Sequence, residues 1–172
     1  MDDLFLNGNM KLLLPMQQNS EYKSTIINMI GENEYNVLMS LSVDDFDQSF
    51  EGFRKYSGDY KLLQILIPEY IIVNNISNSQ SRNMHWHLGQ VHAFNNNYKE
   101  AVSEMKQSYE GGSLTWASYV SGSIAFLEKD KPALLKSLET MESLENQMNI
   151  EILRSFVMNF DKSYTEAYSS RE

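Results

Sequence analysis

Residues 83–108, NMHWHLGQVHAFNNNYKEAVSEMKQS, are echoed 33 positions later by residues 116–141, WASYVSGSIAFLEKDKPALLKSLETM. In this register Gly89 aligns with Gly122. A repeat period of this length is typical of helical hairpins that stack one after another. The sequence therefore predicts an all-α fold that is built from antiparallel helical hairpins.

Apolar residues in the second half of the first copy recur with the period of an α-helix. They occupy positions i, i+3, i+4, i+7 and i+11, which form one face of a helix. These positions hold Tyr98, Ala101, Val102, Met105 and Tyr109. A glycine inside a helix costs roughly 1 kcal/mol relative to alanine. The equal spacing of Gly89 and Gly122 therefore indicates two places where helices approach too closely for a side chain.

The 172 residues are enough for one domain with a real core, and we expect a single helical domain. Capping signals divide it: Ser42 and Asp45 resemble a capping box, and Asp130 is a good N-cap before Pro132. The predicted segments are N-terminal helices over 1–41, a diverged hairpin over 43–76, two repeat hairpins over 82–110 and 114–145, and a C-terminal capping helix over 146–168.

Several local predictions follow from apolar spacing alone. Phe46, Phe50 and Phe53 are spaced as one helical face. Residues 60–75 are predicted to form a helix with a kink at Pro68, although their Ile and Val content would also suit a strand. A stripe of apolar residues is expected along the helix after Asp130. It comprises Leu134, Leu135, Leu138, Met141 and Leu144. The last long helix is expected to run from about residue 146 to residue 160, and Tyr164, Ala167 and Tyr168 either extend it or form a short cap.

Composition excludes several classes of function. The net charge is −9, from 14 Lys+Arg against 23 Asp+Glu, and no stretch is basic. Nucleic-acid binding and attachment to an anionic membrane both need clustered cations, so we expect neither partner. Cysteine is absent, which excludes disulfides and thiolate chemistry. We find no signal peptide and no segment of the length that spans a bilayer, so a cytoplasmic location is predicted.

Four residues of the first copy carry a family resemblance. Leu88, Gly89, Tyr98 and Ala101 match the pattern of the tetratricopeptide repeat, and the chain resembles this family over about residues 82–145. His92 stands where the family has tyrosine. The resemblance implies a right-handed stack of hairpins, a TPR-like α-solenoid. It also implies that the first helices of successive repeats line a concave groove, which holds a peptide or helix of a protein partner.

The groove implied by the resemblance has an aromatic character. Its predicted face consists of Asn83, Trp86, Gln90, Phe94, Trp116, Tyr119 and Ser123. This set has no cluster of Lys or Arg, so it favours an apolar or aromatic ligand segment over a carboxylate. The sequence thus predicts a non-enzymatic module for protein–protein interaction, with no catalytic residue and no cofactor. A competing interpretation is that Trp86 and Trp116 fill the core.

Two other functions stay open at this point. The acidic charge would suit an inhibitor or immunity-type protein that sequesters a basic partner. A metal-dependent enzyme would have to use His85, His87 and His92, of which His85 and His92 share one side of a helix. Because zinc on a helix normally takes histidines at i and i+4, these are weak candidates and no metal site is predicted. Open ends of a short stack also leave a homodimer open.

Overall fold

The computed structural model describes residues 22–109, 112–144 and 149–170. Within these ranges every regular element is a helix, and no β-strand occurs, so the predicted all-α class is confirmed. Contacts between residues divide the chain into two compact units, with the boundary between Ile76 and Ser77. Of the predicted N-terminal segment 1–41, only residues 22–41 lie within the described part. Each helix in the described ranges is too short or too polar to cross a bilayer.

The first unit contains a short series of helices, of which α3 (Val43–Gln48) and α4 (Tyr60–Val73) begin at a side-chain cap. Ser42 accepts a hydrogen bond from the backbone N–H of Asp45 (3.1 Å), as the sequence predicts, and Asp59 likewise accepts one from Leu62 N (3.1 Å). Residues 22–30 are helical and are followed by α2 (Glu32–Ser40), α3 (Val43–Gln48), the 3-10 helix η1 (Phe53–Tyr56) and α4 (Tyr60–Val73).

The three phenylalanines near α3 do not share a helical face. α3 ends at Gln48, and the chain then turns so tightly that a Cβ on Gly52 would overlap the Phe46 carbonyl. Phe46 and Phe53 are buried in the first unit, whereas Phe50 lies in the turn and is 77 % exposed. The prediction for Phe50 is therefore wrong, because the helical period was extended past the end of the helix.

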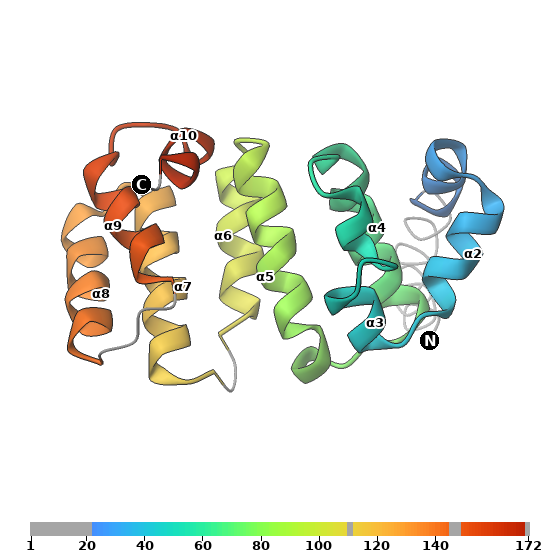
Figure 1. Cartoon of the computed structure of the whole chain (residues 1–172), viewed down its shortest axis with the longest axis horizontal. Coiled ribbons are helices and arrows are strands. Elements are labelled where there is room, and N and C mark those ends of the chain that lie inside the picture. The colour runs from blue at the N-terminus through green and yellow to red at the C-terminus, as the bar shows by residue number, and fades with distance from the viewer. Residues whose placement is uncertain (1–21, 110–111, 145–148, 171–172) are drawn as a thin grey trace, which may run out of the picture. The chain divides into compact units, whose positions relative to one another are not determined.

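The second unit consists of six helices within its described residues, and they pack as neighbours along the chain (Figure 1). α5 packs on α6, α7 packs on α8, and α6 also contacts α7. α9 lies on α7 and α8, while α10 contacts α9 and α5. Their bounds are α5 (Asn78–Phe94), α6 (Tyr98–Gln107), α7 (Leu114–Leu127), α8 (Lys131–Ser143), α9 (Ile150–Met158) and α10 (Tyr164–Ser169).

Both repeat glycines lie where helices approach closely, as predicted. A Cβ on Gly89 would come within 2.6 Å of Met105 Cγ and 3.1 Å of the Ala101 carbonyl oxygen, both on α6. A Cβ on Gly122 would come within 2.8 Å of Leu153 on α9 and 3.1 Å of Ser137 Cβ on α8. The glycines thus set the spacing of helices in the second unit.

Two predictions for the C-terminal helices need correction. Asp130 does cap α8, accepting a hydrogen bond from Ala133 N (3.0 Å). Leu135 and Leu144 are 46 % and 38 % exposed, however, so both lie outside the buried stripe. The last long helix ends two residues before its predicted end at residue 160, and residues 146–148 of the prediction lie outside the described part of the chain. α9 ends at Met158, and a separate helix begins after Ser163, whose side chain and that of Glu166 form a reciprocal capping box.

Candidate functional site

Three aromatic rings of the predicted face meet in the second unit. Trp86 on α5 lies 5.2 Å from Trp116 and 4.9 Å from Tyr119, measured between ring centroids, and both partners belong to α7. Trp86 is 5 % exposed and Tyr119 is 2 % exposed. Trp116 is half-buried, and its indole N–H donates a hydrogen bond to the Ser108 carbonyl (2.9 Å). We call Trp86, Trp116 and Tyr119 the aromatic cluster; its burial at Trp86 agrees with the competing core interpretation.

The other members of the predicted face differ in how far a partner could reach them. Asn83 is exposed and Gln90 is partly buried, with its side-chain oxygen 3.3 Å from His87 Nδ1. Phe94 packs edge-on against Tyr164 of α10, with centroids 5.1 Å apart. Ser123 is fully buried. The members of this face that solvent reaches are therefore Asn83, which is exposed, and Gln90, Phe94 and Trp116, which are partly buried.

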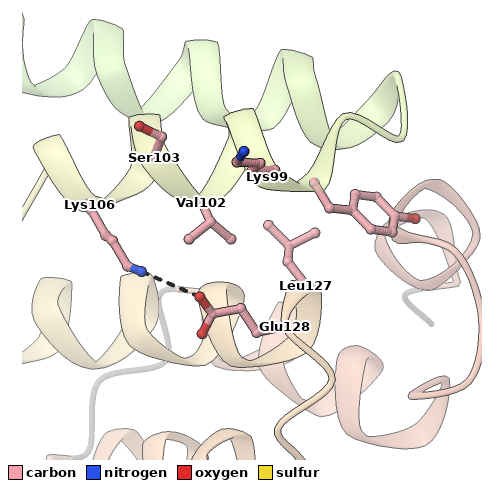
Figure 2. A pocket seen from close by; sticks show the side chains of 7 residues that line it. Lys99, Val102, Ser103, Lys106, Leu127 and Glu128 are labelled. Atoms are coloured by element: carbon pink, nitrogen blue, oxygen red, sulfur yellow. Dashed lines mark hydrogen bonds and ion pairs between the residues drawn. The ribbon is translucent and has the colours of Figure 1, made fainter.

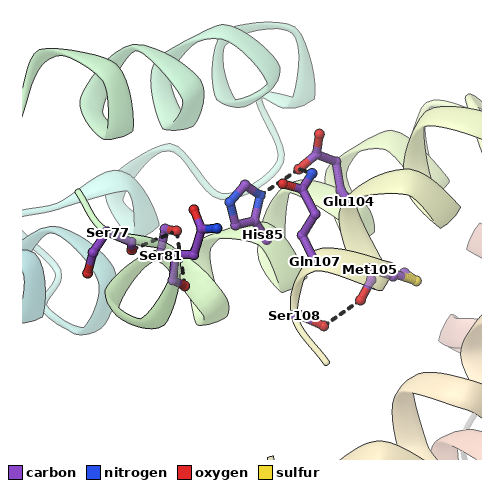
Figure 3. A network of polar contacts seen from close by, with 8 residues as sticks. Ser77, Ser81, His85, Glu104, Met105, Gln107 and Ser108 are labelled. Atoms are coloured by element: carbon purple, nitrogen blue, oxygen red, sulfur yellow. Dashed lines mark hydrogen bonds and ion pairs between the residues drawn. The ribbon is translucent and has the colours of Figure 1, made fainter. Parts of the chain in front are cut away.

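Two of the three histidines face acidic residues of α6. His85 Nδ1 lies 2.7 Å from Glu104 Oε2, which also accepts a hydrogen bond from Gln107 (Figure 3). Burial lowers the pKa of His92 below its usual value, and the nearby carboxylates of Glu104 and Glu100 oppose this effect in part. Across the described residues, no three His, Asp or Glu side chains are grouped as a metal site would need. His85 thus joins α5 to α6 through Glu104, whereas the Gln90 side chain beside His87 lies on α5 itself.

The structure also contains a pocket that the sequence did not reveal. The α6–α7 pocket has a volume of about 480 Å³. Figure 2 shows that Val102 of α6 and Leu127 of α7 point toward each other at its base, and Lys106 contacts Glu128 (3.3 Å). In the sequence, only the spacing of Lys99 and Lys106 on the polar side of α6 could have indicated this pocket. The residues that line the pocket are Tyr98, Lys99, Val102, Ser103, Lys106, Leu127 and Glu128.

A second pocket of about 380 Å³ lies between α7 and α8. Its walls are mostly small side chains, including Ala117, Ser121 and Ala133, and Leu114 at its edge is 62 % exposed. Lys136 is the only charged side chain among its described lining residues. This pocket offers space but few groups that could recognise a particular ligand.

The two candidate surfaces differ in chemistry. The predicted face combines amide side chains with an indole edge, and the α6–α7 pocket combines an apolar base with lysines. No protein-family model, curated protein or solved structure matches the chain.

Proposed function

We propose that the chain is an interaction module of the tetratricopeptide-repeat type, a stack of helical hairpins that binds a segment of a partner protein along α5 and α7. The observation that carries this proposal is the contact between Trp86 and Tyr119. These residues are aligned in the two sequence copies, and they meet across the two helices that would be the first helices of successive repeats. A stack of such hairpins places its first helices side by side along one surface.

The chemistry of the accessible residues favours an extended peptide as the ligand. Asn83 and Gln90 are seven positions apart on α5, so they share one side of the helix with Trp86 between them. An amide side chain both donates and accepts hydrogen bonds, which suits the N–H and C=O groups of a peptide backbone. The half-buried Trp116 adds rigid apolar contact area. The buried rings of Trp86 and Tyr119 would hold these groups in place.

The test compares capture of proteins from an extract of the source cells by the immobilised chain. A variant with Asn83→Arg and Gln90→Arg obstructs the face without touching its core. Asn36→Arg, an exposed change on α2, is the matched control. We expect the control to retain the proteins that the unmodified chain retains, and the double variant to lose them while its circular dichroism is unchanged. Equal capture by all three proteins would reject this face as the binding surface.

Salt separates this proposal from the acidic-inhibitor alternative. Attraction between an acidic chain and a basic partner is screened at high ionic strength, because the Debye length falls from about 10 Å at 0.1 M to about 3 Å at 1 M. Capture through apolar and hydrogen-bonding contacts should persist at 1 M salt. Loss of all captured proteins at that concentration would favour sequestration of a basic partner instead.

A further inference from the structure

We infer that the α6–α7 pocket is a second binding site, and that it takes an amphipathic helix of a partner that carries two acidic side chains and an aliphatic side chain between them. The site is formed by residues other than the predicted face on α5 and α7. It therefore extends the proposed function to a second surface, and its test does not depend on the first surface binding anything.

The base of the pocket is apolar. Val102 is 9 % exposed and Leu127 is 5 % exposed, and their side chains point toward each other beneath the opening (Figure 2). Tyr98 also lines the pocket, and its hydroxyl donates to Asn96 Oδ1 (3.0 Å) and accepts from Tyr164 N (3.1 Å). These bonds fix the ring as a wall. The apolar base can take a branched aliphatic side chain, and the volume of about 480 Å³ leaves room for neighbouring parts of the ligand.

The charge of the pocket supplies the choice of partner. The chain carries a net charge of −9, yet the pocket is lined by two lysines and one carboxylate. That carboxylate, Glu128, contacts Lys106 (3.3 Å), and the Lys106 and Glu128 side chains are 59 % and 50 % exposed. Because the ammonium group of lysine has three N–H donors, Lys106 can also donate to a carboxylate of the ligand. Lys99 has no ion-pair or hydrogen-bond partner within the described residues. The local surplus of positive charge on an acidic chain favours an acidic ligand over a basic one.

The spacing of the lysines supplies the shape of the ligand. Lys99 and Lys106 are seven positions apart on α6, so they lie on the same side of the helix and about 10.5 Å apart along its axis. A helix that lies alongside α6 can match this spacing with acids at positions i and i+7. An aliphatic residue at i+3 or i+4 then lies midway, above Val102. Docking of an apolar helix face into a groove is a common mode of recognition.

The experiment titrates the isotopically labelled full chain with a synthetic 20-residue alanine-rich helical peptide. The peptide carries glutamates seven positions apart and a leucine midway between them, and binding is followed by nuclear magnetic resonance. We expect saturable shifts of the amide signals of Lys99, Val102, Ser103, Leu127 and Glu128. Absence of saturable shifts at these residues would overturn the proposal. So would equal affinity for a peptide with alanine in place of the leucine.

The decisive protein variants are Lys99→Glu and its matched control Lys61→Glu. Both lysines are exposed, and both are the second residue of a helix that begins with tyrosine, at α6 and α4. We expect Lys99→Glu to weaken peptide binding at least tenfold, and Lys61→Glu to leave it unchanged. Equal weakening by both variants would show attraction to overall charge only, and would overturn the site.

Two further controls separate this proposal from its alternatives. The variant with Asn83→Arg and Gln90→Arg should bind the peptide normally, so that failure of the proposed function and failure of this inference are distinguishable. Sedimentation of the unmodified chain tests whether a second copy occupies the pocket. A dimer that Lys99→Glu converts to a monomer would replace the external helix with self-association and overturn the proposal.

Discussion

Substitution of Gly89 by alanine tests the close approach of α5 and α6. At an exposed helix position this change stabilises a protein by roughly 1 kcal/mol, because alanine favours the helix more than glycine does. Here the new Cβ would lie 2.6 Å from Met105 Cγ, 3.1 Å from Ala101 O and 3.2 Å from Met105 N. Two of these neighbours are backbone atoms that cannot turn away. Overpacking of this kind costs about 1–3 kcal/mol.

The two effects oppose each other, and the overpacking should win. We expect Gly89→Ala to lower the free energy of unfolding by about 1 kcal/mol, which is the middle of the overpacking range less the helix gain. The assay is urea denaturation of the full chain, followed by far-UV circular dichroism. Asn33→Ala on the exposed side of α2 is the control for helix propensity alone.

A double-mutant cycle with Met105→Ala identifies the contact itself. Met105 is fully buried, so its truncation alone should cost about 2–5 kcal/mol. In the double variant, the methyl group of alanine at position 89 faces the space that the Met105 side chain has left. The two changes should then cost less together than the sum of their separate effects, by about 1 kcal/mol. A stabilising Gly89→Ala, or strictly additive effects, would refute the close approach at this position.

Three further predictions concern titratable and capping groups. Burial raises the pKa of Glu69, so the protonated side chain contributes stability that is complete below about pH 4.3 and is lost as pH rises through the pKa of the folded state. Glu69→Gln should reduce this loss, as measured by urea denaturation midpoints at a series of pH values. Burial lowers the pKa of His92, so stability is complete above about pH 6.5 and is lost as pH falls through the folded value; His92→Gln should remove this acid loss. Asp130→Ala should cost about 1 kcal/mol in the same assay, because it removes the cap of α8.

The sequence was sufficient to predict features that depend on interactions between residues close together in the chain. The caps at Ser42 and Asp130 depend on residues three positions away, and both were predictable. The helix boundary after Met158 could also have been found, since Ser163 and Glu166 have the spacing of a capping box. Phe50 was misplaced because a helical period says nothing about where the helix ends.

The candidate surfaces were less predictable, because they depend on which helices meet. Periodicity placed Trp86 and Tyr119 on corresponding helix faces, but it could not decide whether their rings meet solvent or each other. The α6–α7 pocket requires Glu128, at the end of α7, to lie beside Lys106 of α6. That pairing joins residues 22 positions apart in sequence and leaves no mark in either segment alone.

Contact between the only two tryptophans of the chain is the most direct test of the packing on which the binding face depends. Trp86 and Trp116 meet edge to face with ring centroids 5.2 Å apart, although they belong to different helix pairs. A nuclear Overhauser spectrum of the folded chain should show cross-peaks between the two indole ring systems. A well-dispersed spectrum in which both indoles are resolved and no cross-peak joins them would contradict the account.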